Sequence, residues 1–225
     1  LGYYKYSDFF LANINLLFGA DIPMFRLLLP LAISFFTFQQ IAYLVDCYRK
    51  EAKEYDLLTY CLFVSFFPQL IAGPIVHHKE MMPQFYNPDN SRLNWDNIAR
   101  GVFIFCMGLF KKTVIADTFA VWADEGYTDP TNPEFFTAWQ TSLCYTMQLY
   151  YDFSGYSDMA IGLGRIFGFD FLKNFNYPYI SKSLTEFWRR WHISLSRWLR
   201  DYLFLPIAYA LMRKYSKPRL LRIKT

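Results

Sequence analysis

Long apolar windows without charge alternate along the chain with short charged stretches. Leu27–Val45 contains 19 consecutive uncharged residues and Leu57–Val76 contains 20. Phe135–Tyr151 is a third window, of 17 residues. A hydrocarbon core about 30 Å thick needs about 20 helical residues, with about 17 as the practical minimum. The pattern therefore predicts an all-helical bundle that crosses a membrane.

Other apolar stretches are too short or too interrupted to form straight spans. They are Gly101–Phe110, Met159–Leu172 and Tyr202–Met212. Gly73 and Pro74 also interrupt the second long window, and backbone groups freed at membrane depth must be satisfied by protein or by a cavity. We therefore expect a polytopic transmembrane bundle in which some helices are short, broken or re-entrant.

An amphipathic helix is predicted over residues 183–203. Ser183 and Glu186 have the spacing of a capping box, which favours a helix start. Successive residues of a helix are 100° apart. On this spacing, one side of the helix carries the apolar residues Trp188, Trp191, Leu195, Trp198, Leu199 and Tyr202. The opposite side carries the charged residues Glu186, Arg189, Arg197 and Arg200. His192 lies one turn after Trp188, so we expect its imidazole to border both a dry and a polar surface.

Composition supports a membrane location, with 54% hydrophobic, 21% aromatic and 19% charged residues. The net charge of +4 comes largely from Lys111-Lys112 and from Arg213–Lys224, clusters that the positive-inside rule assigns to cytoplasmic ends. A lipid bilayer is the expected partner; nucleic acid is not, because no stretch resembles a nucleic-acid module. The first residue is leucine and no signal peptide is evident, so we expect residues 1–225 to be one membrane-embedded segment, incomplete at both ends.

His192 is the first candidate for chemistry. A general base works best with a pKa near the working pH, and histidine starts near about 6.5. Partial desolvation would favour the neutral imidazole, which can take a proton from an alcohol. The alternative is a hydrogen-bonded histidine that only orients its neighbours.

Asp152, Ser154, Ser157 and Asp158 form a polar cluster within apolar sequence. The two carboxylates are six residues apart, so they do not share one helical face as a paired acid/base site would require, and Gly155 is expected to break the helix between them. They could orient a histidine, bind polar backbone ends, or pair with Arg189 or Arg190. Structural pairing is the favoured interpretation, because buried charges need partners.

No metal site is predicted. His77 and His78 are adjacent, so they cannot share a helical face, and no third ligand is evident; we read them as loop residues. The cysteines have neither metal-ligand nor redox spacing and are read as buried reduced thiols: Cys47, Cys61, Cys106 and Cys144. The arginines near His192 could bind phosphate, carboxylate or lipid headgroups, or could form a salt-bridged helix face.

Several long motifs, in order along the chain, resemble the membrane-bound O-acyltransferases, and within them the bacterial branch of alginate O-acetylation and D-alanyl transfer. The resemblance begins near Phe35. The matching stretches are Phe67–Ile75, Phe110–Asp117, Tyr151–Asp158, Asn176–Tyr179 and, the most specific, Phe187–Tyr202 with its Trp-Arg-Arg-Trp-His core.

The resemblance implies a membrane enzyme that moves an acyl group, expected to be acetyl, from a cytoplasmic thioester to a hydroxyl of a cell-envelope polysaccharide or wall polymer. The co-substrate would be acetyl-CoA or an acyl carrier protein, with no bound cofactor. An extracytoplasmic partner protein would complete transfer, and the protein would sit, multi-pass, in the bacterial plasma membrane. His192 matches the family's essential histidine. The supporting candidates are Asp152, Ser154, Asp158, Trp188, Arg189, Arg190, Trp191, Ser196, Arg200 and Asp201.

The sequence departs from the family pattern in two places. The family carries a second histidine, in a Trp-His-Gly context, that this chain lacks, so the segment alone is expected to be inactive. Alginate-type members have a glycine pair after the position of Pro206, where this chain has Ile207-Ala208. Two other functions stay open: a transporter or channel that uses Asp152 and Asp158, and a non-catalytic membrane scaffold.

Overall fold

The computed structural model describes residues 2–30, 32–52, 56–70, 73–128 and 134–215. Within these ranges all regular secondary structure is helical and no strand occurs, which confirms the all-helical prediction. The residues of the Arg213–Lys224 cluster from 216 onward lie outside the described residues.

The helices before the long hairpin are α1 (Gly2–Phe18), α2 (Ile33–Tyr48), α3 (Leu57–Ser65), α4 (Phe67–Leu70), α5 (His78–Phe85) and the 3₁₀ turn η1 (Pro88–Ser91). The hairpin and the segments after it are α6 (Trp95–Phe110), the π-helical turn η2 (Lys111–Ala116), α7 (Asp117–Tyr127), α8 (Phe135–Ile166), η3 (Pro178–Ile180), α9 (Leu184–Arg190), α10 (Ile193–Trp198), the π-helical turn η4 (Leu199–Phe204) and α11 (Leu205–Tyr215).

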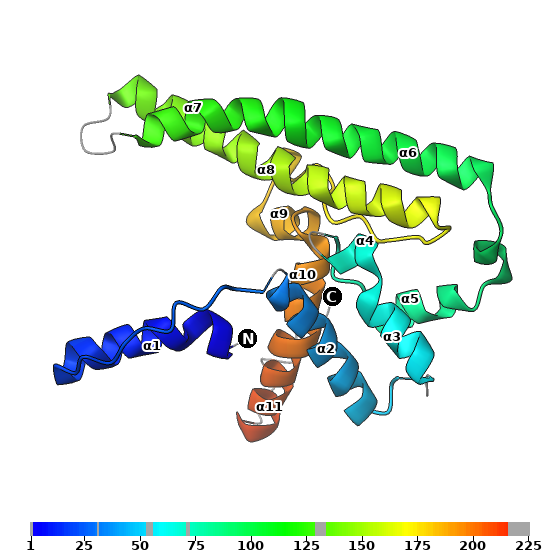
Figure 1. Ribbon diagram of the computed structural model, residues 1–225, viewed down its shortest axis with the longest axis horizontal. Coiled ribbons are helices and arrows are strands. Elements are labelled where there is room, and N and C mark those ends of the chain that lie inside the picture. The colour runs from blue at the N-terminus through cyan, green and yellow to red at the C-terminus, as the bar shows by residue number, and fades with distance from the viewer. Residues whose placement is uncertain (1, 31, 53–55, 71–72, 129–133, 216–225) are drawn as a thin grey trace.

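The continuous run α6–η2–α7 lies along α8 and forms an upper layer over the remaining helices (Figure 1). Glycines on both helices allow this close approach. A Cβ on Gly108 would lie 2.6 Å from the Gly155 carbonyl oxygen, and one on Gly162 would lie 2.7 Å from the Gly101 carbonyl oxygen. The expected helix break at Gly155 is therefore wrong: α8 continues through it, and the glycine serves the contact between helices.

The long apolar windows do not each form one helix. In the first window, α2 begins only at Ile33. In the second, α3 ends at Ser65 and Phe66 is extended, because Pro68 has no N–H to continue the helical hydrogen bonds. Phe135–Tyr151 is helical throughout, as the first part of α8. Among the described residues, no helix combines the length and the apolar character that a single membrane crossing requires.

The predicted continuous helix over residues 183–203 is also wrong. Its start is correct, since the Ser183 hydroxyl accepts a hydrogen bond from the Glu186 N–H. The helix then stops at Arg190, and Trp191 adopts an extended conformation. A new helix begins after His192, so positions on the two sides of His192 do not share one helical projection.

Two apolar clusters hold the lower helices together. The larger joins Phe63 on α3 and the α5 methionines to the segment after α8, and the smaller packs Trp198 against Ala42 and Ile75. His78 is the first residue of α5 and is buried, so it is not the loop residue that we expected. Three of the four cysteines are exposed and only Cys144 is buried, which corrects the expectation of buried thiols.

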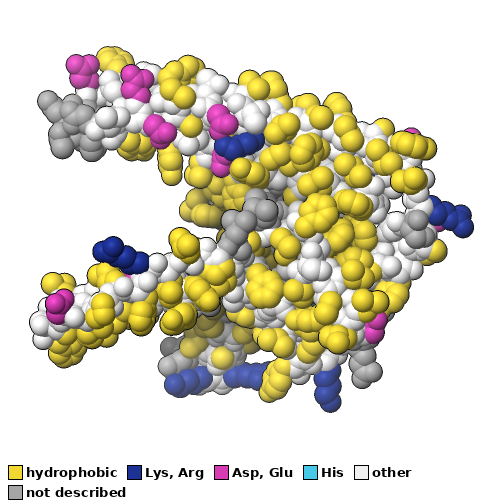
Figure 2. Space-filling view, viewed as in Figure 1, with side chains coloured by type: hydrophobic (Ala, Val, Ile, Leu, Met, Phe, Trp, Pro, Cys, Tyr) yellow, Lys and Arg dark blue, Asp and Glu magenta, His cyan; other side chains and the backbone are white. Residues whose placement is uncertain are grey.

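Large apolar side chains remain exposed over many helices. Figure 2 shows them spread across the visible face. Examples are Leu16, Phe18 and Phe136, each about four-fifths exposed at 82%, 79% and 81%. Soluble monomers rarely expose contiguous apolar surface on this scale.

Candidate active site around His192

His192 occupies the break between α9 and α10 in a left-handed backbone conformation, with φ 42° and ψ 58°. Such a conformation costs a non-glycine residue about 1–3 kcal/mol and persists where surrounding contacts impose it. Here the next residue provides one of these contacts, because the Ile193 N–H donates to the Asn174 carbonyl oxygen at 2.9 Å. The break turns the imidazole inward, where the residue is only 7% exposed.

Asn174 is the centre of the polar contacts around His192. Its Oδ1 lies 3.0 Å from His192 Nδ1 and accepts from the Ser194 hydroxyl at 2.9 Å and the Ser194 N–H at 3.2 Å. Its Nδ2 donates to Ser157 Oγ at 3.2 Å. Asn174, Ser157 and Ser194 are 1%, 1% and 4% exposed. We call these four residues the asparagine–histidine network.

Aromatic rings also pack around the imidazole. Phe153 of α8 meets it edge-on with ring centroids 4.7 Å apart. Phe175 and Phe35 lie at 6.3 Å, from the loop after α8 and from α2. The expectation of a histidine at the margin of an amphipathic helix is wrong, because the break buries it within apolar and neutral polar groups.

The predicted carboxylates pair with lysines. Asp152 lies 2.8 Å from Lys112 Nζ, and Asp158 lies 2.6 Å from Lys111 Nζ. Lys112 also contacts Asp117 at 2.5 Å. We call these five residues the lysine–aspartate ladder. The predicted structural pairing is confirmed, but the partners are not Arg189 or Arg190. Both lysines belong to η2, inside the continuous helical run.

Other predicted residues divide between the interior and the surface. Ser154 is 2% exposed, and its hydroxyl has no hydrogen-bond partner among the described residues. Trp191 stacks on Phe187 with centroids 5.6 Å apart. Arg190 forms an ion pair with Glu186 at 2.8 Å, within α9.

Four of the remaining candidates line an open groove, and the fifth, Asp201, lines a neighbouring charged cleft. The groove measures about 920 Å³ and is lined by Thr185, Trp188, Arg189, Ile193, Ser196, Arg197, Arg200 and Phe204. Three of these lining residues are arginines. Arg200 is paired with its neighbour Asp201 at 2.7 Å. His192 does not line the groove, although Ile193 does.

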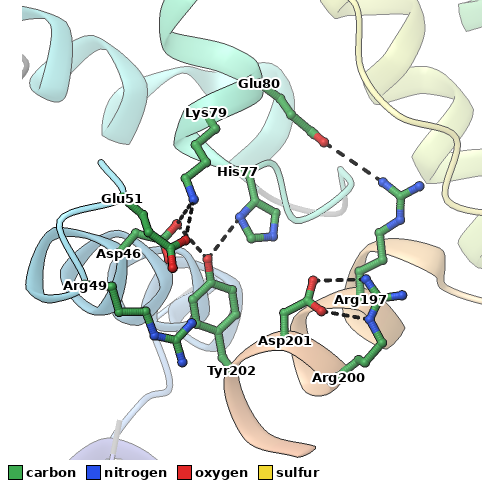
Figure 3. A pocket seen from close by; sticks show the side chains of 10 residues that line it. All are labelled: Asp46, Arg49, Glu51, His77, Lys79, Glu80, Arg197, Arg200, Asp201 and Tyr202. Atoms are coloured by element: carbon green, nitrogen blue, oxygen red, sulfur yellow. Dashed lines mark hydrogen bonds and ion pairs between the residues drawn. The ribbon is translucent and has the colours of Figure 1, made fainter. Parts of the chain in front are cut away.

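A second, charged cleft of about 420 Å³ lies where α2, α5 and η4 meet. The buried Asp46 accepts from the Tyr202 hydroxyl at 2.9 Å, and His77 stacks on the Tyr202 ring (Figure 3). Lys79 bridges Asp46 and Glu51, and its hydrogen bond holds the pKa of the Glu51 carboxyl below its usual value. Each carboxylate of the cleft lies within 4.0 Å of a cationic side chain, so the cleft is an ion-pair cluster.

Sequence reasoning missed Asn174 and Ser194. A signal was present, because Asn174 and Asn176 stand on either side of a phenylalanine in an aromatic-rich segment. An asparagine is expensive to bury among aromatic side chains unless its amide is fully hydrogen-bonded. Ser157 belonged to the polar cluster that drew attention to α8, but its contact with Asn174 depends on the fold.

Comparison with known proteins gives a consistent family assignment. Residues 47–222 match the model of the membrane-bound O-acyltransferase family. The chain is 52% identical to a peptidoglycan O-acetyltransferase of Helicobacter pylori, over 92% of this chain and 44% of the relative. It is 48% identical to a probable alginate O-acetylase, AlgI, of Pseudomonas aeruginosa, over 92% and 40%. A teichoic acid D-alanyltransferase of Bacillus subtilis is 29% identical, over 85% and 49%. The chain thus spans less than half the length of these relatives.

Proposed function

Because the chain belongs to the membrane-bound O-acyltransferase family, we propose that the full-length protein transfers an acyl group, specifically acetyl, to a hydroxyl of a cell-envelope polysaccharide. The names of the relatives support this proposal. Two of them are named a peptidoglycan O-acetyltransferase and a probable alginate O-acetylase, at 52% and 48% identity, whereas the D-alanyltransferase is more distant at 29%. The donor is a cytoplasmic thioester, acetyl-CoA or an acyl carrier protein, and an extracytoplasmic partner completes transfer.

In this proposal His192 is the general base. It removes the proton of the acceptor hydroxyl while the hydroxyl oxygen bonds to the thioester carbonyl carbon. The tetrahedral oxyanion then collapses, the carbon–sulfur bond breaks, and the proton passes to the leaving thiolate. Polar groups around the reacting carbon stabilise the oxyanion. The observation that carries the assignment is the burial of His192 in a neutral network, where no carboxylate among the described residues pairs with it.

The proposed location is the bacterial plasma membrane, with residues 1–225 as one multi-pass membrane segment. The exposed apolar side chains on α1, α2, α6 and α8 support this location. Apolar surface on this scale is unfavourable in water, and lipid would cover it. The unpaired backbone N–H and C=O groups at the ends of the short and broken helices would find hydrogen-bond partners within the bundle of the complete protein.

The test compares the full-length protein with a His192→Gln variant in membranes that contain its partner, with radiolabelled acetyl-CoA as donor. We expect label incorporation into the polysaccharide to fall by about 10²-fold or more, the usual contribution of a general base. His77→Gln is the matched control, because His77 is also a histidine beside an aromatic ring but belongs to the charged cleft. Equal transfer by His192→Gln and the parent, at equal amounts of folded protein, would overturn the assignment.

A further inference from the structure

The orientation of the Asn174 amide is fixed by its neighbours. The backbone N–H of Ser194 points at one terminal atom of this side chain at 3.2 Å. A backbone N–H can only donate, so the atom that it faces must be the amide oxygen. The amide nitrogen is then directed at Ser157 Oγ, which can accept.

The same oxygen determines which nitrogen of His192 carries a proton. Asn174 Oδ1 lies 3.0 Å from His192 Nδ1, and an amide oxygen can only accept. Nδ1 must therefore be the protonated nitrogen. In the neutral imidazole the other nitrogen, Nε2, then holds a free lone pair.

The surroundings prevent the network from rearranging easily. Asn174 Oδ1 receives three donors and is almost fully buried, so turning the amide would leave buried groups unsatisfied. Two backbone hydrogen bonds of 2.9 Å also fix the segment around Asn174 against the helix break. The Ile193 N–H donates to the backbone carbonyl oxygen of Asn174, and the Asn176 N–H donates to the backbone carbonyl oxygen of Arg190. Phe153 blocks rotation of the imidazole from the side of α8.

We propose that Asn174 is a positioning residue that holds His192 in the Nδ1–H tautomer, so that Nε2 faces the reaction as the proton acceptor. This inference rests on the proposed role of His192 as general base. Asn174 does not touch the reacting atoms in this scheme. Ser194 and Ser157 act through Asn174, by fixing the orientation of its amide.

The first test is spectroscopic and needs no turnover. Full-length protein labelled with ¹⁵N in its histidine rings is examined by NMR, and the His192 signals are identified by their loss in His192→Gln. At a pH where the ring is neutral, we expect the directly protonated nitrogen to be Nδ1. In Asn174→Leu, which keeps the approximate size but removes the acceptor, we expect that tautomer to be lost. A native ring protonated on Nε2 would overturn the proposal.

The second test measures transfer of labelled acetyl groups from acetyl-CoA. We expect Asn174→Leu to lower transfer by about 10²-fold, as for loss of the base itself, and Asn174→Asp to restore the Nδ1–H tautomer and much of the transfer at mildly alkaline pH. An aspartate can accept the same three donors, and Ser157 can turn its hydroxyl to donate to it. Asn176→Leu is the control, because Asn176 is exposed two residues away and its side chain forms no hydrogen bond among the described residues.

Two outcomes separate this inference from the proposed function. If His192→Gln abolishes transfer but folded Asn174→Leu keeps both the native tautomer and native transfer, the role of Asn174 is refuted and the base role stands. If the ring has the Nδ1–H tautomer and depends on Asn174 for it, yet His192→Gln transfers normally, Asn174 orients His192 but the general-base assignment fails. Monodispersity in detergent establishes that each variant is folded.

Discussion

Two polar clusters include residues of the same helix, α8, and they satisfy their polar groups in different ways. The lysine–aspartate ladder is made of full charges, and its members are partly exposed, from 24% for Lys112 to 51% for Asp117. The asparagine–histidine network has no charged pair, and its members are at most 7% exposed. Burial of an ion pair carries a large desolvation cost, whereas neutral groups can be buried once their hydrogen bonds are made.

The contrast indicates which cluster can take part in chemistry. In the ladder each carboxylate already has an ammonium partner within 2.8 Å, so the charges stabilise the contact between η2 and α8. In the network the contacts of Asn174 direct a proton to His192 Nδ1 and leave Nε2 free. A site for proton transfer needs such an unused group, held in place by partners that are fully satisfied.

The largest expected difference between the clusters is in acyl transfer. We expect the double variant Asp152→Asn, Asp158→Asn to keep transfer within about tenfold of the parent, while loss of His192 lowers it by about 10²-fold or more. Asparagine is nearly isosteric and can still accept from the lysines. Incorporation of acetyl label into polysaccharide is the measurement. A collapse of transfer in the folded double variant would instead favour an ion or proton path through the ladder.

The frame that places both clusters on α8 depends on the glycine contacts with α6. Gly108→Ala puts a Cβ 2.6 Å from a backbone oxygen, and backbone cannot move aside as a flexible side chain can. We expect a loss of stability of about 1–3 kcal/mol, the usual cost of overpacking, seen as a lower midpoint of thermal unfolding in detergent. Gly2→Ala is the control, since its added Cβ meets nothing within 4 Å. If Gly108→Ala and the parent unfolded at the same midpoint, α6 and α8 could move apart at this contact without a loss of stability.

Sequence patterns predicted the helical class and the start of α9, because these depend on composition and on a local cap. They failed where tertiary contacts decide the outcome. The periodicity of residues 183–203 gave no sign of the break at His192, which is stabilised by a hydrogen bond to residue 174. Gly155 was read as a helix breaker because its partner, Gly108, is distant in sequence. The lysine partners of the carboxylates were missed for the same reason.

A smaller effect is expected from the ladder itself. Lys112 contacts two carboxylates, so Lys112→Met leaves Asp117 and Asp152 without this partner. Because both carboxylates are more than a third exposed, solvent screens the loss, and we expect about 1 kcal/mol of destabilisation. Lys112→Arg should recover most of it. The measurement is thermal unfolding at low and high salt, and a salt-independent change would show that the charges are not responsible.

The smallest effect tests whether the start of α9 matters to the His192 break at its other end. Ser183→Ala removes the hydroxyl that accepts from the Glu186 N–H at 3.1 Å, and an N-cap of this kind contributes about 0.5–2 kcal/mol. Since Ser183 is exposed, we expect the low end of this range, and Ser183→Thr should keep the cap. Transfer should be unchanged, because Asn174 and the Ile193 N–H hold the break independently of the cap. If Ser183→Ala lowered transfer as much as Asn174→Leu, the position of His192 would depend on the whole of α9 and not on the asparagine–histidine network.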